Sequence, residues 1–278
     1  MTLRSGLLAL LLLVGGCLGN DAGALGHRPI ADSIPEPDPA QIIEVVDGDS
    51  LVMSVSGDRT DVRLVGINAP ERDECLGIES GDNLARLVAG RLIGIVTSGT
   101  DQYGRTLAIV TADGEPVNLL QVADGLAIPL AADTPLEGSI LSAEAEARAG
   151  GIGLWSPESC GTGPLADVAL VDIEPNPPGN DEEKLDEERV TIRNNGPTRV
   201  DLAGWVLRDE STANRFRFGD GVALDPGSSL QVVTGCSSGP GVVAWCSDTP
   251  VWNNGGDTAF LIDRDGRIVD LLRYRVDR

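Results

Sequence analysis

Hydrophobic and polar positions follow two different patterns along the chain. Between residues 41 and 160, short β-branched runs such as IIEVV and SLVMSV are bounded by Asp-Gly and Gly-Asp turns, which is typical of strands. Segments of helical spacing at 83–92, 117–127 and 139–151 separate these strands. Strands and helices mixed in this order predict an α+β unit, a small barrel packed with helices.

The pattern changes after GTGPLAD (161–167) to strands alone. About seven short strands with turn signals between them fill residues 168–274, and this spacing is typical of an all-β sandwich.

The N-terminus has the features of a leader. Arg4 precedes a short apolar run, Leu7 to Val14, and the run is too short to span a bilayer, so it predicts a signal peptide. Val-Gly-Gly-Cys17 resembles a bacterial lipobox, in which the cysteine becomes the lipidated first residue. A plain secretory signal with an incidental cysteine is the alternative. We therefore expect a cell-envelope lipoprotein or a secreted protein, organised as a leader (1–17), a linker (18–40), a first domain (41–160), a short linker (161–165) and a second domain (166–278).

Four further cysteines suggest disulfides, because export implies an oxidising compartment. Four cysteines allow three pairings. Cys236 and Cys246 lie in one loop, and each domain is expected to close its own bridge, which leaves Cys75 with Cys160. A metal-binding cysteine set is the alternative, but it lacks any C-x-x-C spacing.

Charge and composition exclude several classes of protein. The 278 residues carry a formal charge of −22 and a single histidine, His27, in the linker. A His-based hydrolase triad and a multi-His zinc site are therefore excluded, and the charge content excludes a multi-span membrane protein. A protein that grips nucleic acid by bulk positive charge is excluded as well.

Three segments of the first domain contain groups that could act together on a phosphodiester. They are Asp47-Gly48-Asp49-Ser50, then Arg63 with Asn68-Ala69-Pro70-Glu71, then Asp101-Gln102-Tyr103-Gly104-Arg105. Phosphodiester hydrolysis needs a hard cation held by oxygens, a base for water and rigid cations that face the phosphate. Each segment alone is typical of an ordinary turn or a surface arginine, so the interpretation depends on their order and spacing.

In that order and spacing, the first domain resembles the thermonuclease family, the staphylococcal-nuclease-like domain. VVDGDSLVM is similar to its V-x-D-G-D-T segment, VRLVGINAPE to R-L-x-x-[IV]-[DN]-x-P-E, and DQYGRTLAIV to D-x-Y-G-R-x-L-A. The resemblance covers about residues 41–160. It implies an OB-type five-stranded barrel with helices, and hydrolysis of DNA and RNA phosphodiesters with Ca²⁺, leaving 3′-phosphates.

Carried over by position, the resemblance implies a catalytic set. Glu71 corresponds to the general base that activates water. Arg63 and Arg105 correspond to the cations that stabilise the phosphorane transition state. Tyr103 matches an aromatic residue that packs near the nucleotide.

The same resemblance implies a calcium site. Asp49 and Asn68 fall on the side-chain ligands, and Ala69 on the ligand that uses its main-chain carbonyl. The best-known members have Asp where this chain has Asn68, so one negative charge is lost and we expect weaker metal affinity. The stretch AIPLAADTP (127–135) lacks the tyrosines that contact the sugar and phosphate in those members.

The second domain resembles the lamin-tail domain through VDLAGWVLRDE, a Pro-Gly turn and WNNGGDTAFLIDRDGRIVD. The resemblance spans about residues 166–274 and implies an immunoglobulin-like sandwich. Trp205 and Trp252 are interpreted as core residues. The resemblance implies no ligand, and the partner of this domain stays open.

Three functions are weighed. The first is an exported calcium-dependent nuclease with DNA, RNA or both as substrate, which touches a membrane only through a possible N-terminal lipid anchor. The second is a non-catalytic nucleic-acid or surface-binding module. The third is a structural envelope protein in which both domains are scaffolds.

Overall fold

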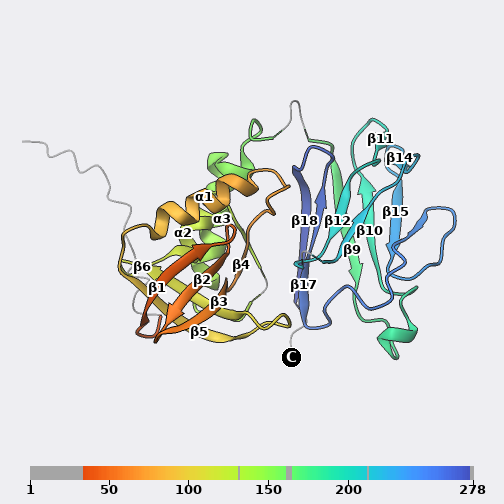
Figure 1. Ribbon diagram of the computed structural model, residues 1–278. Coiled ribbons are helices and arrows are strands. Elements are labelled where there is room, and N and C mark those ends of the chain that lie inside the picture. Colours follow the sequence, from red (N-terminus) through yellow and green to blue (C-terminus); the bar gives the residue numbers. More distant parts are fainter. Residues whose placement is uncertain (1–33, 131, 161–164, 212, 276–278) are drawn as a thin grey trace, which may run out of the picture.

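The computed structural model describes residues 34–130, 132–160, 165–211 and 213–275, which form two units side by side (Figure 1). The predicted leader with Cys17, and the linker up to residue 33, lie outside the described residues. Within the described part of the chain, no helix is long and apolar enough to cross a membrane.

The first unit is a closed barrel of five strands. Its main sheet has the order β3-β2-β1-β5-β6, and β3 pairs with β6 in parallel, which closes the sheet on itself. The α+β barrel expected from the sequence is thereby confirmed. The strands are β1 (Asp38–Val45), β2 (Ser50–Val55), β3 (Asp58–Leu64), β5 (Ile93–Thr100) and β6 (Thr106–Ala112), with the short β7 (Glu115–Pro116) and the pair β4 (Ile67–Asn68) and β8 (Ile128–Pro129) beside them. The linker was expected to run to residue 40, but β1 takes in its last three residues.

Three helices and a short 3₁₀ turn complete this unit: α1 (Gly77–Val88), α2 (Val117–Ala123), α3 (Glu137–Gly150) and η2 (Gly153–Trp155). The helix predicted over 83–92 begins six residues earlier and ends four residues earlier. Gly77 and Gly81 look like helix breakers in the sequence, which is why the first turn was missed. Gly77 is required by packing, because a side chain there would overlap the main chain of Glu71, whereas a side chain at Gly81 would make only ordinary contacts with Asp47.

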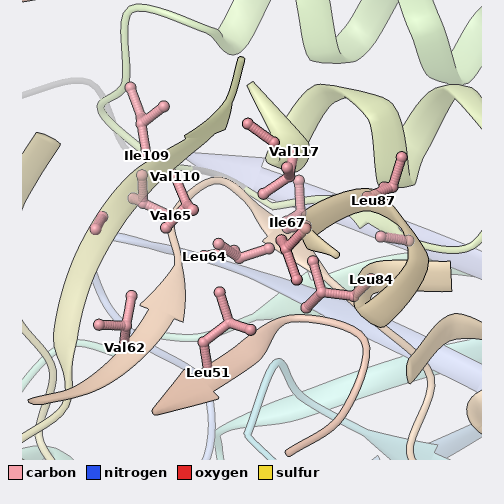
Figure 2. Close-up of a cluster of buried hydrophobic side chains, with 14 of the residues drawn as sticks. Leu51, Val62, Leu64, Val65, Ile67, Leu84, Leu87, Ile109, Val110 and Val117 are labelled. Carbon is pink, nitrogen blue, oxygen red and sulfur yellow. The ribbon is translucent and has the colours of Figure 1, made fainter. Parts of the chain in front are cut away.

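The barrel interior is filled by aliphatic side chains from the strands and from α1 (Figure 2). Val62 and Leu64 on β3 are each only 1% exposed and pack with Leu51 and Leu84. Since successive side chains on a strand point to opposite faces, Arg63 between them is directed to the outside of the barrel. The same alternation that builds the core therefore aims a cation at the barrel surface.

The second unit is a sandwich of two four-stranded sheets, as expected. One sheet has the order β16-β15-β10-β9 and the other β13-β12-β17-β18. Trp205, Phe218 and Trp252 are buried between them, so the core role of both tryptophans is confirmed. The strands are β9 (Val168–Glu174), β10 (Arg189–Asn194), β12 (Val206–Arg208), β13 (Arg215–Arg217), β15 (Ser229–Val233), β16 (Val242–Ala244), β17 (Gly256–Ile262) and β18 (Ile268–Arg275), with the pair β11 (Val200–Asp201) and β14 (Ala223–Leu224) and the 3₁₀ turn η3 (Asp181–Glu183) outside the two sheets.

The β17–β18 side of the sandwich faces the barrel (Figure 1). An apolar cluster seals this contact, in which Ile128 of β8 packs with Val206, Phe260 and Ile262 of the sandwich. Polar bonds cross beside it, because Arg273 donates to the Pro129 carbonyl at 2.8 Å and pairs with Glu144. The two domains therefore share a packed interface.

Both expected disulfides are formed. Cys75 pairs with Cys160 across 85 residues, and Cys236 pairs with Cys246 across 10. The first bridge ties the loop after Pro70 to the end of the first domain. The alternative of a metal-binding cysteine set is therefore wrong for these four.

Candidate active site

The loop between β1 and β2 carries the first two carboxylates of the site. The Asp49 N–H donates to the Asp47 carboxylate at 3.0 Å, and the Val46 N–H donates to the Ser50 carbonyl at 2.9 Å, which fixes the turn. A side chain at Gly48 would overlap Ser80 of α1, so only glycine allows the helix to pack here. The Asp-Gly-Asp sequence is thus explained by packing as well as by chemistry.

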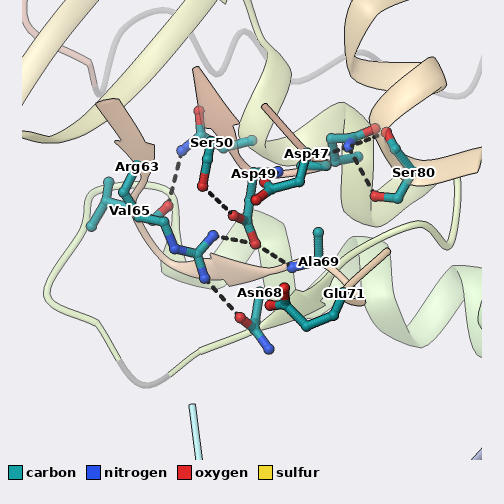
Figure 3. Close-up of polar contacts among 12 residues, drawn as sticks. Asp47, Asp49, Ser50, Arg63, Val65, Asn68, Ala69, Glu71 and Ser80 are labelled. Carbon is teal, nitrogen blue, oxygen red and sulfur yellow. Dashed lines mark hydrogen bonds and ion pairs between the residues drawn. The ribbon is translucent and has the colours of Figure 1, made fainter. Parts of the chain in front are cut away.

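Asp49, Arg63, Asn68 and Ala69 form a buried polar cluster at the ends of β2, β3 and β4 (Figure 3). The Arg63 guanidinium forms an ion pair with the Asp49 carboxylate and donates to Asn68 Oδ1 at 2.7 Å. The same carboxylate accepts the Ala69 N–H at 2.5 Å and the Ser50 hydroxyl at 3.0 Å. A buried carboxylate requires a counter-charge and hydrogen bonds, and Asp49 has both.

The charge on Arg63 is perturbed but retained. Burial, and then the nearby charge of Arg105, lower the pKa of Arg63 to about 10, while Asp47 and Glu71 act in the opposite direction. The guanidinium is therefore cationic at neutral pH. Arg63 and Arg105 are close enough to affect one another and both line the pocket, so two guanidinium groups are available to an anionic ligand.

Glu71 stands in the turn that follows β4. Burial, and then the charges of Asp47 and Glu74, raise the pKa of its carboxyl above the usual value. Its own N–H donates to Glu74 Oε2 at 2.9 Å, and the Glu74 N–H returns a bond to the Glu71 carbonyl at 2.8 Å. A carboxylate of raised pKa is a stronger base than an ordinary one.

Arg105 is held in the turn between β5 and β6 by Asp101. Its Nε donates to Asp101 Oδ2 at 2.7 Å, and its N–H to Oδ1 at 2.9 Å. Burial would raise the pKa of Asp101, but the hydrogen bonds from Arg105 outweigh it and keep that pKa below its usual range. The half-exposed Tyr103 ring lies 5.6 Å from the Arg105 guanidinium carbon, within cation–π range.

A pocket of about 520 Å³ brings these groups together, and both domains line it. We call the barrel side, Asp49, Arg63, Asp101 and Arg105, the barrel wall. We call the opposite side, Asp209, Glu210, Asn214 and Asn253, the sandwich wall. Glu71 and Tyr103 also line the pocket, and Tyr103 Oη lies 2.7 Å from Ser211 Oγ across the domain boundary.

The sandwich wall contains carboxyls with strongly raised pKa values. Burial raises the pKa of Asp209, and the hydrogen bond from Asn214 lowers it by a smaller amount. The resulting pKa is about 7. Burial and then the charge of Asp257 raise the pKa of Glu210 to about 8. Much of this wall is therefore protonated at neutral pH and does not present its full formal charge to a phosphate.

The oxygen donors of the buried cluster formed by Asp49, Arg63, Asn68 and Ala69 suit a hard cation. Asp49 offers a carboxylate, Asn68 an amide oxygen and Ala69 a main-chain carbonyl, which is the ligand chemistry that calcium prefers. Asn68 Nδ2 is buried and has no hydrogen-bond partner among the described residues, so the cluster leaves one polar donor unsatisfied. In the described part of the chain, no three His, Cys, Asp or Glu side chains form a ready-made metal cage, so a cation here depends on the neutral oxygens.

The structure brings five of the residues that the sequence singled out in the first domain into one pocket: Asp49, Arg63, Glu71, Tyr103 and Arg105. Asn68 and Ala69 do not line that pocket, and instead contact Arg63 and Asp49 in the buried cluster. Four further participants were missed, namely Asp47, Glu74, Asp209 and Glu210. Asp47 was within the quoted motif and could have been found. The other three act across the domain boundary, where sequence spacing carries no signal.

Two family models match the chain. The model described as staphylococcal nuclease homologue matches residues 61–157, and the lamin tail domain model matches residues 162–275. The first match ends and the second begins between the two units seen in Figure 1.

Relatives match less than half of the chain. An uncharacterized endonuclease of Haemophilus influenzae is 33% identical over 124 residues, which cover 44% of this chain and 68% of that protein. Protein ParB of Escherichia coli is 33% identical over 130 residues, 42% of this chain and 71% of that protein. Micrococcal nuclease of Shigella flexneri is 29% identical over 126 residues, 42% of this chain and 72% of that protein.

Proposed function

Because this chain belongs to the staphylococcal nuclease homologue family and carries a lamin tail domain after the barrel, we propose that it is a nuclease that hydrolyses phosphodiester bonds of DNA, RNA or both. The observation that carries the proposal is the pocket in which Arg63, Glu71 and Arg105 meet. The names of the relatives, endonuclease and micrococcal nuclease, support the same reaction class. Calcium as cofactor and export to the cell envelope or outside the cell are further parts of the proposal.

Each side chain has a role in the proposed reaction. Glu71 accepts a proton from the attacking water, and its raised pKa favours that transfer. Arg63 and Arg105 donate to the phosphate oxygens as negative charge develops on them. Tyr103, half exposed at the pocket rim, offers a flat surface for the nucleotide.

Asp49, Asn68 and the Ala69 carbonyl would hold the calcium ion. When bound, it would supply Lewis-acid stabilisation of the phosphate charge. The replacement of an acidic ligand by Asn68 predicts weaker calcium affinity than a two-carboxylate site would have.

The binding-module alternative has less support. Three catalytic groups assembled in one pocket exceed what binding without cleavage requires, and no observation favours a scaffold role. If the chain bound DNA without calcium and did not cleave it, the binding-module alternative would be favoured.

Cleavage of plasmid and single-stranded DNA with calcium, and with a chelator, tests the proposal. We expect calcium-dependent cleavage by the wild-type chain and a loss of about 10²–10⁴-fold in Glu71→Gln. Full activity in Glu71→Gln, or no cleavage by the wild type under any divalent cation, would overturn it.

A further inference from the structure

Glu74 connects the turn of Glu71 to the second domain. Its side chain is only 5% exposed, although it is ionisable. One carboxylate oxygen, Oε2, accepts the Glu71 N–H at 2.9 Å. A displacement of the Glu74 carboxylate would therefore displace the main chain from which the Glu71 side chain extends.

Two arginines of the sandwich hold that carboxylate. Arg208 on β12 donates through Nε to Oε1 at 3.0 Å and through Nη2 to Oε2 at 3.2 Å, a two-pronged contact. Arg215 on β13 donates to Oε1 at 2.8 Å. The Arg208 side chain is 2% exposed, and its guanidinium carbon lies 4.2 Å from the centre of the Phe260 ring.

Adhesion between the domains does not by itself explain this arrangement. Burial of an ion pair costs desolvation that its attraction can fail to recover, so such pairs fix geometry more reliably than they add stability. The apolar cluster of Ile128 and Phe260 already seals the interface. What the pair adds is a rigid path of hydrogen bonds from the sandwich to the Glu71 main chain.

On the basis of the nuclease function proposed above, we propose that Arg208 and Glu74 are positioning residues for Glu71, so that the lamin tail domain completes the nuclease active site. Arg208 fixes the Glu74 carboxylate, and Glu74 fixes the Glu71 turn. Glu71 alone then contacts the attacking water.

The chain offers graded variants and a matched control. Arg208→Met keeps the packing on Phe260 and removes the guanidinium, and Arg208→Lys restores the charge without the two-pronged contact. Glu74→Leu removes the acceptor of the Glu71 N–H. Arg199→Met is the control, since Arg199 lies in the same domain, its side chain is 64% exposed, and among the described residues it pairs with the exposed Asp225.

Steady-state cleavage of a single-stranded oligonucleotide by the full chain tests the proposal, at a temperature well below each variant's Tm. We expect kcat to fall by about 10–100-fold in Arg208→Met, because small misplacements of a catalytic group carry penalties of this size, with KM changed less than about twofold. Arg208→Lys is expected to lie between wild type and Arg208→Met, and Arg199→Met at the wild-type value.

Exchange of the Glu71 amide proton gives a second readout that needs neither substrate nor calcium. We expect faster exchange in Arg208→Met and Glu74→Leu than in wild type and Arg199→Met, because the bond to Glu74 is weakened or lost. A lower Tm with unchanged kcat and unchanged Glu71 exchange would overturn the proposal and leave a purely adhesive contact. Absence of cleavage by the wild type would instead refute the nuclease function, so the two failures are distinguishable.

Discussion

The barrel wall and the sandwich wall of the pocket both present carboxylates, but they give them different partners. On the barrel wall, Asp49 is paired with Arg63 and Asp101 with Arg105. On the sandwich wall, Asp209 is hydrogen-bonded by the Ser211 N–H and the Asn214 amide, and Glu210 by the Thr258 hydroxyl, all neutral donors.

This difference in partners decides which side chains are charged. A carboxylate beside an arginine stays ionised, whereas one that is buried among neutral groups holds its proton to higher pH. The barrel wall therefore presents paired charges suited to a phosphate, and the sandwich wall confines the pocket while contributing little negative charge at neutral pH. The comparison teaches that partners, more than residue type, determine what each wall contributes.

Removing a cation from the barrel wall gives the largest expected effect. Arg63→Met leaves the buried Asp49 without its counter-charge, and breaking a buried pair in this way costs about 3–5 kcal/mol. The free energy of unfolding, from urea titration, measures the loss. Asp49→Asn combined with Arg63→Met is the control, and a double variant as unstable as the sum of both singles would contradict the pairing argument.

Arg105→Met separates catalysis from stability on the same wall. The Arg105 side chain is 34% exposed, and such pairs contribute about 0–1 kcal/mol, so the free energy of unfolding is expected to change little. Loss of one transition-state donor is expected to lower kcat by about 10²–10³-fold. Urea titration measures the free energy of unfolding of Arg105→Met, and steady-state kinetics measure its kcat. A kcat equal to that of the wild type would remove Arg105 from the proposed mechanism.

The sandwich wall is expected to respond to alkaline pH. In the folded chain the pKa values of Asp209 and Glu210, about 7 and about 8, lie well above the ordinary values of these carboxyls. The stability that these two carboxyls contribute is therefore complete below their pKa values in the unfolded chain. It is lost as pH rises through their pKa values in the folded chain. Asp257 opposes ionisation of Glu210, while Arg63 favours it.

We therefore expect the Tm of the chain to fall by several degrees between pH 6 and pH 9. The doubly substituted Asp209→Asn, Glu210→Gln chain should show a flatter profile over the same range, measured by calorimetry. Parallel profiles for the two proteins would show that the sandwich wall is not the group that titrates.

The smallest expected effect concerns salt. The net charge of −22 repels nucleic acid at long range, and salt screens that repulsion beyond about 10 Å at 0.1 M. We expect kcat/KM to rise, or to stay within about twofold, as salt increases from low to moderate concentration. A steep decline would show that attraction at the barrel wall outweighs the charge of the whole chain.

The barrel wall could be predicted from the sequence because Asp49, Arg63 and Arg105 fall in three ordered motifs that resemble those of the thermonuclease family. Strand pairing then sets Ser50 opposite Arg63, which places the first two motifs next to one another. The pairing of Cys75 with Cys160 followed from the expectation of one bridge in each domain. The predicted start of α1 was wrong because Gly77 serves a close approach to the Glu71 main chain that helix propensity does not describe.

The sandwich wall could not be predicted, because nothing in the sequence indicates which faces of two domains meet. Arg208 lies 134 residues from Glu74, on a strand whose pattern predicts burial but gives no partner. The raised pKa values of Asp209 and Glu210 arise from that burial, so they also depend on the docked arrangement.

The contact of Glu74 with Arg208 and Arg215 has a consequence for how such a chain can change over generations. A substitution of Glu74 or Arg208 alone leaves the other as an unpaired or less completely paired buried charge, so these two positions are expected to vary together or not at all. Recombination that exchanged the lamin tail domain for another would break the set at once. The buried charges thereby make the two domains hard to separate.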